Sequence, residues 1–328
     1  MCHKNLLARL IFGMSALFFF PVCAADFPTK PIQLVVPYGA GPGDSLARIL
    51  SVCMAPRLKQ PVLVVNKPGA NAVLGAKFVS TASPDGHTII LAASATVTDL
   101  VTSRNPAFDV RTELEPITKL GSGVQGLYVN STLPIQTITD LVNYAKARPG
   151  QLNYATAGVG SVNHVSTEAL STTTGIKMTH VPFPGGTGPF LSALMGGVVE
   201  VAMTDLGGAQ AALDSGKIRL IGVMSKERLQ SRPHVPTVIE SFPSMLPYLG
   251  TLWFGFFAPP KTPKDIMVVL HTEIVACLNE PITRASLKKF GYEDSQIVAN
   301  TPEQFRKSIL EDIERLKDIV QRADIQLR

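Results

Sequence analysis

The sequence has few charged residues, few aromatic residues and little bias in its charge. Charged residues make up 17% of the 328 residues and aromatic residues 7%, and the formal net charge is +5. Lys4 and Arg9 lie in an N-terminal segment that we expect to be removed; without them the net charge is 28 − 25 = +3. This excess is too small and too scattered to indicate a nucleic-acid partner.

The sequence also lacks the spacings that bind metal ions. Its four cysteines form no C-x-x-C pair, and its six histidines form no H-x-x-x-H pair. We therefore expect no metal ion and no cofactor. Only Cys53 and Cys277 lie beyond the N-terminal segment, and the sequence is compatible with a disulfide between them or with two buried thiols.

The apolar run near the N-terminus is too short to cross a bilayer. LIFGMSALFFFPV covers 13 residues, whereas a membrane span requires about 20 residues. A basic start, this run and the small residues of CAAD together indicate an export signal. We predict that residues 1–25 form a signal peptide cleaved near Ala24 or Ala25, and that the protein is exported to the periplasm. Lipidation at Cys23 is less favoured, because no small residue precedes that cysteine.

Length and alternating patterns predict an α/β protein with two lobes. With 45% hydrophobic residues, the chain can bury two cores. Strand-like runs alternate with helix-like spacing, which is typical of a mostly parallel sheet flanked by helices. A second series of this kind follows, and a last strand and three helices return the chain to the first unit. The predicted boundaries are 26–124 with 251–328 for lobe 1 and 125–250 for lobe 2, with a hinged cleft between them.

The glycines after the first predicted strand do not fit a nucleotide site. Gly39, Gly41 and Gly43 give G-x-G-x-G, whereas the dinucleotide fingerprint is G-x-G-x-x-G. The second predicted strand ends at Asn66, where a carboxylate would hold the ribose. No G-K-[ST] sequence follows. We therefore exclude nucleotide binding as the main interpretation.

Hydrolase motifs are incomplete as well. GVGSV at 158–162 lacks the two glycines that flank a nucleophile elbow at fixed distance. Ser161 is better interpreted as a helix N-cap, and the spacing supplies no catalytic partner for His164. Carboxylates from separate loops could still pair, so an exported enzyme acting on a small carboxylate remains the alternative.

Four loops of glycine and small residues each precede a predicted helix. They are GAGPGD at 39–44, PGANA at 68–72, AGVGS at 157–161 and PGGTG at 184–188. A helix start exposes unpaired N–H groups and a partial positive charge, which bind anions such as carboxylates. A single loop of this kind is more often only a tight turn. Several of them facing one cleft in an exported chain favour an anion-binding site.

Longer blocks of the sequence resemble a known family. The blocks include NKPGAN, LGAKFVSTASPDGHTIILA, LNYATAGVGSVNH, HVPFPGGTGPFLSALMGGVVEVAMTD and WFGFFAPPKTPKDIMVVLHTEI. In order and spacing they are similar to the tripartite tricarboxylate transporter substrate receptors, the Bug or TctC-like periplasmic binding proteins. The resemblance implies a type II-like, two-lobed α/β binding protein that acts as a monomer, is not an enzyme and closes on an organic anion. It also implies delivery to membrane transporter subunits, although a sensing receptor remains an alternative.

The resemblance also implies where the ligand lies. From the first loop it selects Tyr38, Gly41, Pro42, Gly43 and Asp44, and from the start of the second-lobe helix Gly158, Gly160, Ser161 and His164. Ser94, Gly185, Gly186 and Asp205 complete the implied wall. Two departures from the family pattern matter: the first loop is one residue shorter and contains Pro42, which removes an amide donor, and Asn71 occupies a position that is commonly glycine.

Overall fold

The structure is a computed structural model that describes residues 27–39, 41–183, 186–250 and 252–322. The predicted signal peptide, residues 1–25 with the expected cleavage site near Ala24 and Ala25, lies outside these ranges. Gly185, one of the predicted site residues, lies outside them too.

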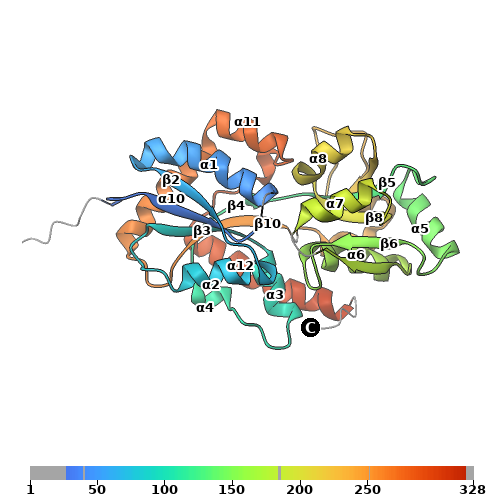
Figure 1. Cartoon of the computed structure of the whole chain (residues 1–328), viewed down its shortest axis with the longest axis horizontal. Helices are drawn as coiled ribbons and strands as arrows, with labels where there is room; N and C mark the ends of the chain where they lie inside the picture. The colour runs from blue at the N-terminus through green and yellow to red at the C-terminus, as the bar shows by residue number, and fades with distance from the viewer. Residues whose placement is uncertain (1–26, 40, 184–185, 251, 323–328) are drawn as a thin grey trace, which may run out of the picture.

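The described residues form two five-stranded sheets, which occupy the two halves of the molecule in Figure 1. Sheet 1 has the order β2-β1-β3-β10-β4, and β10 is its antiparallel member. Its strands are β1 (Ile32–Val36), β2 (Val62–Asn66), β3 (Thr88–Ala93), β4 (Glu115–Ser122) and β10 (Trp253–Ala258).

Sheet 2 repeats the arrangement of sheet 1. Its order is β7-β6-β8-β5-β9, and β5 is antiparallel to both of its neighbours. Its strands are β5 (Gln125–Asn130), β6 (Asn153–Thr156), β7 (Thr179–Pro182), β8 (Val201–Asp205) and β9 (Ile218–Val223). In each sheet the antiparallel strand is the fourth in the order. It is also the first strand after the chain passes from one sheet to the other: β5 follows the passage into sheet 2, and β10 follows the return to sheet 1. The expected mostly parallel sheets are therefore present, with one reversed strand in each.

Helices cover both faces of sheet 1, and together they form lobe 1. One face packs against α1 (Pro42–Leu58), α10 (Lys264–Asn279) and α11 (Pro281–Lys289). The other packs against α2 (Val73–Ser80), which follows the short η1 (Ala70–Ala72), and against α3 (Ala95–Thr102) and α12 (Pro302–Arg322). Figure 1 shows the two layers on opposite sides of the sheet. The alternation of a strand explains this: in β1, Leu34 and Val36 contribute to one core and Val35 to the other.

Sheet 2 and its helices form lobe 2. Its elements are α5 (Ile138–Ala147), α6 (Val162–Thr174), α7 (Thr187–Met195), α8 (Leu206–Asp214), α9 (Val238–Ser241) and η2 (Pro243–Tyr248). The buried faces of α6 and of α12 belong to one continuous hydrophobic cluster, because α12 packs against α3 and β4 in lobe 1 and against α6 and η2 in lobe 2. The long C-terminal helix therefore ties the two lobes together.

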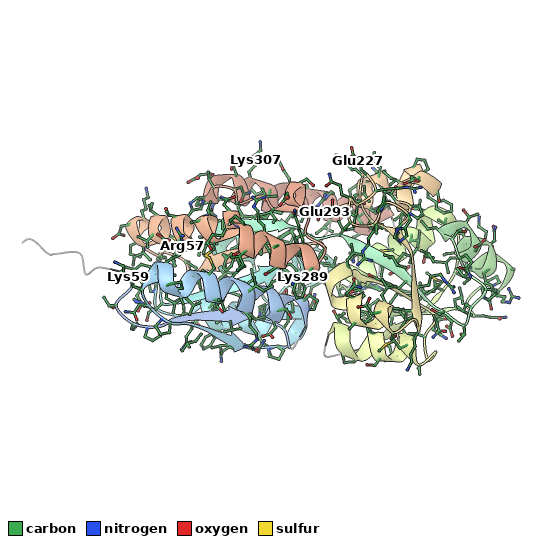
Figure 2. All side chains as sticks on the ribbon, turned by 90° about the horizontal axis from the view of Figure 1, so that it is seen from above. Arg57, Lys59, Glu227, Lys289, Glu293 and Lys307 are labelled. Atoms are coloured by element: carbon green, nitrogen blue, oxygen red, sulfur yellow. A yellow bond between two sulfur atoms is a disulfide. The ribbon has the colours of Figure 1, made fainter. Side chains whose placement is uncertain are left out.

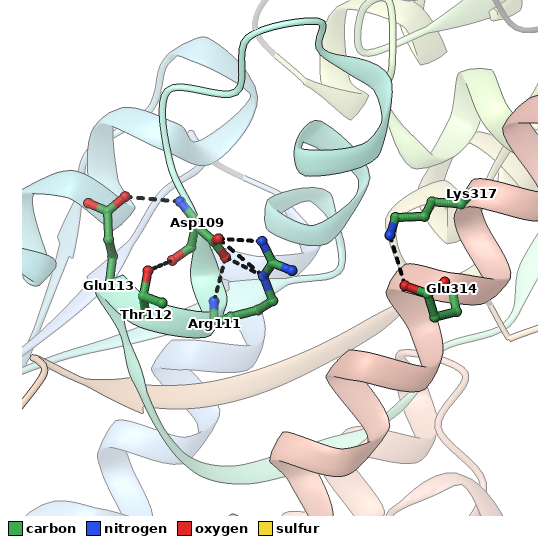
Figure 3. Close-up of polar contacts among 6 residues, drawn as sticks. All are labelled: Asp109, Arg111, Thr112, Glu113, Glu314 and Lys317. Atoms are coloured by element: carbon green, nitrogen blue, oxygen red, sulfur yellow. Dashed lines mark hydrogen bonds and ion pairs between the residues drawn. The ribbon is translucent and has the colours of Figure 1, made fainter.

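Short polar contacts hold the edge of lobe 1 beside α12. In α4 (Val110–Glu113), Asp109 caps the helix by accepting a 3.0 Å bond from the Arg111 amide, and Glu113 accepts a 2.9 Å bond from the Asp109 amide. Figure 3 shows this cap near α12, where Lys317 pairs with Glu314 at 2.8 Å. Glu314 and Lys317 lie on the exposed face of α12, opposite its buried apolar residues.

Two prolines lie within the first helix. α1 begins at Pro42 and continues past Pro56 to Leu58. Pro42 fits because the first turn needs no intrahelical N–H. Strand β4 was not predicted, because EPITKLGS contains Pro116 and the polar Thr118 and Lys119; β10 and α12 nevertheless bury it.

The structure decides the question of the two cysteines. Cys53 on α1 and Cys277 on α10 form a disulfide, with Cα atoms 5.8 Å apart. Arg57 reinforces the same helix pair by bonding Glu273 at 2.8 Å and Glu280 at 3.1 Å. Its position near the end of α1 is visible in Figure 2.

Among the described residues, no single helix is long and apolar enough to cross a membrane. Only α10 and α11 taken together reach the required length and composition, and they are bent by 70° relative to each other.

Candidate functional site

A cavity of about 420 Å³ lies between the two lobes. Its walls come from the loops that follow β1, β2 and β3 in lobe 1 and β6, β7 and β8 in lobe 2. The carboxyl ends of parallel strands are where α/β sheets usually bind ligands. The repeated topology of the two sheets thus points two such edges at one space.

Six helical segments begin at the cavity wall. Their first residues or caps are Pro42 of α1, Ala72 before α2, Ala95 of α3, Val162 of α6, Thr187 of α7 and Asp205 before α8. The first N–H groups of a helix have no partner within the helix and carry its partial positive charge. The cavity is therefore surrounded by amide donors from both lobes.

The predicted site residues divide into two groups. Eight line the cavity: Tyr38, Gly41, Pro42, Gly43, Asn71, Ser161, Gly186 and Asp205. Five described residues are not part of its wall: Asp44, Ser94, Gly158, Gly160 and His164.

Aromatic rings shape the first loop. The Ala93 amide donates to the Tyr38 hydroxyl at 3.1 Å, and the Tyr38 ring meets the Phe254 ring edge-on with centroids 6.5 Å apart. A Cβ atom on Gly43 would approach Tyr38 Cδ2 to 3.1 Å and Phe254 Cε1 to 3.2 Å. Gly43 therefore allows α1 to start directly against these rings. Burial raises the pKa of Tyr38, so its hydroxyl stays protonated.

Asp44 braces this loop from behind. Its carboxylate receives bonds from Arg48 at 2.9 and 3.0 Å and from the Asn66 amide at 2.9 Å. Asn66 also donates to the Tyr38 carbonyl at 3.0 Å. The Arg48 guanidinium holds the pKa of Asp44 below its usual range, against the effect of burial. Asn66, where a dinucleotide fold would carry a ribose-binding acid, thus fastens the loop instead.

The second loop has a strained backbone at the cavity wall. Ala70, Asn71 and Ala72 have φ values of 46°, 52° and 78°, in the left-handed region that side chains other than glycine rarely adopt. The Asn71 Nδ2 atom is buried, and no hydrogen-bond partner faces it among the described residues. Strain of this kind gathers at ligand-binding segments. Asn71 thus places an amide donor at the cavity.

Ser94 serves the sheet. It is fully buried, its amide donates to the Trp253 carbonyl at 3.0 Å and its hydroxyl accepts from the Trp253 amide at 3.4 Å. The next residue, Ala95, reaches the cavity in its place.

In the loop before α6, the glycines do not line the cavity, but their neighbours do. Ser161 caps α6 as predicted, accepting the His164 amide at 3.3 Å. Gly158 and Gly160 have φ values of 135° and 74°, which explains the need for glycine at both positions. Ala157, Val162 and Asn163 line the cavity along with Ser161.

Asp205 is the only Asp or Glu among the cavity-lining residues described. Its carboxylate caps α8 by accepting the Gly208 amide at 2.6 Å. Burial raises the pKa of Asp205, against the opposing effect of these bonds. Its neutral form is therefore more favoured than that of an exposed aspartate.

Four polar residues of the cavity were not among the predicted site residues. They are Gln125 at the start of β5, Asn163 in α6, Thr187 at the start of α7 and Thr204 at the end of β8. The Gln125 side-chain oxygen accepts the Ser166 hydroxyl at 2.7 Å, and the Asn163 amide donates to the Met203 carbonyl at 2.7 Å. Gln125 and Thr204 each lie near the end of a strand that faces the cleft. They could be recognised as site residues only once the order of the strands in the sheet is known.

Positive side chains do not contribute to this wall. Among the described residues that line the cavity there is no lysine and no arginine. The described residues also hold no group of three His, Cys, Asp or Glu side chains placed to bind a metal ion. An anion here would be bound by backbone amides and neutral side chains.

The lobes touch each other at the edge of the cavity. A Cβ atom on Gly207 would lie 2.6 Å from Phe290 Cα, and one on Gly208 would lie 2.6 Å from Pro42 Cγ. The amide and hydroxyl of Ser231 donate to Glu293 at 2.9 and 3.0 Å, and Glu293 lies near the boundary between the lobes in Figure 2. The start of α8 thus packs closely against lobe 1.

Two repeated α/β lobes around a cleft, crossed twice by the chain, define the periplasmic binding protein fold. The sequence model of the tripartite tricarboxylate transporter family receptor, TctC, matches residues 46–325. The chain therefore belongs to this family of solute-binding receptors, as its sequence blocks indicated.

Individual proteins agree with this assignment. BugT of Bordetella pertussis is 30% identical over 312 residues, covering 94% of each chain. An R. palustris protein solved with adipate has a TM-score of 0.85 and 29% identity, covering 92% of this chain and 99% of its own. MatC from Rhodopseudomonas palustris with bound malate has a TM-score of 0.81 and 30% identity, covering 90% of this chain and 100% of its own.

Proposed function

We propose that this receptor binds a small organic anion with at least one carboxylate in the cavity between its lobes. The observation that carries the proposal is the convergence of six helix starts on one space. Such starts bind carboxylates through backbone amides. The cavity of about 420 Å³ falls within the range of small-molecule sites, roughly 300–1,000 Å³.

One further fact supports a carboxylate ligand: two relatives of similar fold are solved with adipate and with malate. Since no lysine or arginine is among the described residues that line the cavity, oriented amides and neutral side chains would be the partners of its negative charge. Because the cavity also holds Asn71, Gln125 and Asn163, the ligand has room for a second polar group.

The predicted residues take separate roles in this proposal. Gly41, Gly43, Ser161 and Gly186 allow the ligand to approach backbone amides, and Tyr38, Pro42, Asn71 and Asp205 shape the wall. Asp44, Ser94, Gly158, Gly160 and His164 support the loops from behind. Gly185 stays a predicted member of the same wall.

Closure around the ligand follows from the two-lobed arrangement. One lobe receives the carboxylate first, and the approach of the other lobe completes the ring of amides. The protein acts in the periplasm after removal of residues 1–25, and it delivers its ligand unchanged to the membrane subunits of a tripartite tricarboxylate-type transporter. No bond of the ligand is broken.

A ligand screen tests this function. Thermal unfolding is measured with di- and tricarboxylates, aromatic acids and acidic amino acids, and the compound that stabilises the protein is recovered and identified by mass spectrometry. The proposal predicts a raised Tm and an unchanged compound. Consumption of the compound would instead favour the exported enzyme, and the lack of any stabilising anion would contradict carboxylate binding.

A further inference from the structure

His164 lies directly behind the cavity wall. It is the third residue of α6 and is 8% exposed, whereas Ser161, Val162 and Asn163 beside it line the cavity. Any effect of His164 on a ligand must therefore pass through the loop that precedes α6.

A hydrogen bond connects the ring to that loop. The Gly160 amide donates to His164 Nδ1 at 3.2 Å, and the His164 amide donates to Ser161 Oγ at 3.3 Å. Ser161 Oγ thus caps the helix, while the His164 ring accepts the amide of Gly160, the residue before the cap. The arrangement resembles a capping box, in which the side chain at this helical position accepts the amide of the cap residue itself. Because Nδ1 accepts a hydrogen bond here, the ring is neutral and carries its proton on Nε2.

A second histidine holds the same loop from the other side. The Thr156 hydroxyl donates to the Gly158 carbonyl at 3.3 Å, and its oxygen receives the Gly158 amide at 3.1 Å and contacts His180 Nε2 at 2.6 Å. The rings of His164 and His180 lie 4.3 Å apart, centroid to centroid. The loop between β6 and α6 therefore rests on two adjacent imidazoles, tilted by 33° relative to each other.

The surroundings of the two imidazoles oppose a positive charge on either ring. Burial and the neighbouring His164 lower the pKa of His180 to about 4, while Glu168 acts in the opposite direction. A proton on His164 would also place a cation at the positive end of α6 and turn its acceptor into a donor facing the Gly160 amide.

The titratable groups around the two imidazoles belong to several elements. The ring of Tyr154 on β6 contacts both imidazoles, and its hydroxyl donates to the Glu168 carboxylate of α6. The strand β8, η2 and α12 also pack against α6. These elements carry Asp205, Tyr248 and Asp312, which interact with Gly208, Arg322 and Arg315.

We propose that neutral His164 is a positioning residue, whose Nδ1 atom holds the Gly160 amide and with it the loop and the start of α6 in the arrangement that binds the ligand. Protonation of the ring breaks this bond and weakens ligand binding. The affinity part of this inference rests on the proposed carboxylate binding, whereas the bond itself can be tested without a ligand.

The first test uses ¹⁵N-labelled protein without ligand. The proposal predicts the Nε2–H tautomer of His164 at pH 8, and a Gly160 amide proton shift that changes with the same midpoint as the His164 ring when the pH is lowered to 4.5. A proton on Nδ1 at pH 8, or a Gly160 shift that does not follow the ring, would overturn it.

The second test compares two substitutions. His164→Asn keeps an acceptor near the position of Nδ1 without titrating, and His164→Ala removes it. With malate and adipate as probes at pH 7.5, we expect the alanine variant to lose about tenfold in affinity, since a buried donor is left unpaired, and the asparagine variant to stay within about threefold of wild type. His234→Asn, at an exposed histidine in the same lobe, is the control.

Acidification separates the histidine from the ligand's own titration. Protonation of malate or adipate affects all variants equally, so the measured quantity is the ratio of the Kd of wild type to that of His164→Asn. The proposal predicts that this ratio rises in step with the protonated fraction of the His164 ring, followed by NMR in the same pH series, and a ratio that does not follow this fraction would contradict it. If neither probe binds wild type, the choice of ligand is wrong and the tautomer measurement alone decides the positioning role.

Discussion

At the scale of single residues, the site depends on backbone amides that no side chain covers. Gly41 illustrates this: it precedes α1, lines the cavity, and has no described atom within 4 Å of the place where a Cβ atom would stand. Its φ of 160° is extended backbone, which alanine also adopts. The protein itself therefore leaves room for a methyl group at this position, and only a bound ligand would collide with it.

Gly41→Ala should therefore weaken ligand binding without unfolding the protein. The methyl group would occupy space against the amides of α1, and we expect a loss of about 1–3 kcal/mol of binding free energy, as for overpacking. Titration calorimetry measures the affinity and thermal unfolding measures the stability. Gly188→Ala, at a glycine that is outside the cavity wall and equally open, is the matched control. Unchanged affinity in the Gly41 variant would place the ligand elsewhere.

At the scale of elements, the cap of α8 combines a structural and an electrostatic role. Asp205 accepts the Gly208 amide, as asparagine could do as well. Burial raises the pKa of the carboxyl group in the folded protein. The folded state therefore favours the protonated form, and the stability that this contributes is present below the unfolded pKa and is lost as the pH rises through the folded pKa.

Asp205→Asn should thus stabilise the protein at pH 8, and the gain should shrink toward pH 4. Because the amide keeps the cap and removes the ionisation, we expect a difference on the order of 1 kcal/mol at pH 8. Thermal unfolding of both proteins at pH 4, 6 and 8 measures it. A wild type that is more stable than the variant at pH 8 would show that the carboxylate is ionised and favourably bound.

Prediction from the sequence succeeded for strands that are buried on both faces, because such strands are continuous apolar runs. Strands such as β1 and β10 are almost wholly apolar, and the predicted cap at Ser161 is present. Strand β4 was missed because Thr118 and Lys119 are buried by elements that lie far away in the sequence, β10 and α12 among them. Asp44 and His164 lie at helix starts beside the cavity without lining it, because sequence gives no information on which side of a helix start faces a cavity. Gln125 is a candidate because β5 begins at the cavity, after the chain has passed from lobe 1 to lobe 2.

At the scale of the whole molecule, two glycines at the start of α8 determine how closely the lobes approach. Gly207 lies against Phe290 and Gly208 against Pro42, each from the opposite lobe. Alanine suits a helix better than glycine by about 1 kcal/mol, so these glycines do not serve the helix itself. They allow the contact between lobes.

Gly207→Ala should hinder closure while leaving both lobes folded. Its Cβ atom would lie 2.6 Å from Phe290 Cα, a distance that forces the lobes apart because the neighbour is backbone. We expect at least tenfold weaker ligand binding, about 1.4 kcal/mol or more, and a larger radius of gyration by X-ray scattering in the presence of ligand. Gly188→Ala again serves as the control. Equal affinity and equal scattering would mean that closure does not use this contact.

The central claim is that helix starts from both lobes bind a carboxylate in the cavity. It is tested most directly by calorimetric titration with the carboxylate that stabilises the protein most and with its uncharged amide. We predict micromolar or tighter binding of the acid and at least a hundredfold weaker binding of the amide, about 2.7 kcal/mol. Equal affinity for both, or no binding of any carboxylate, would contradict the account.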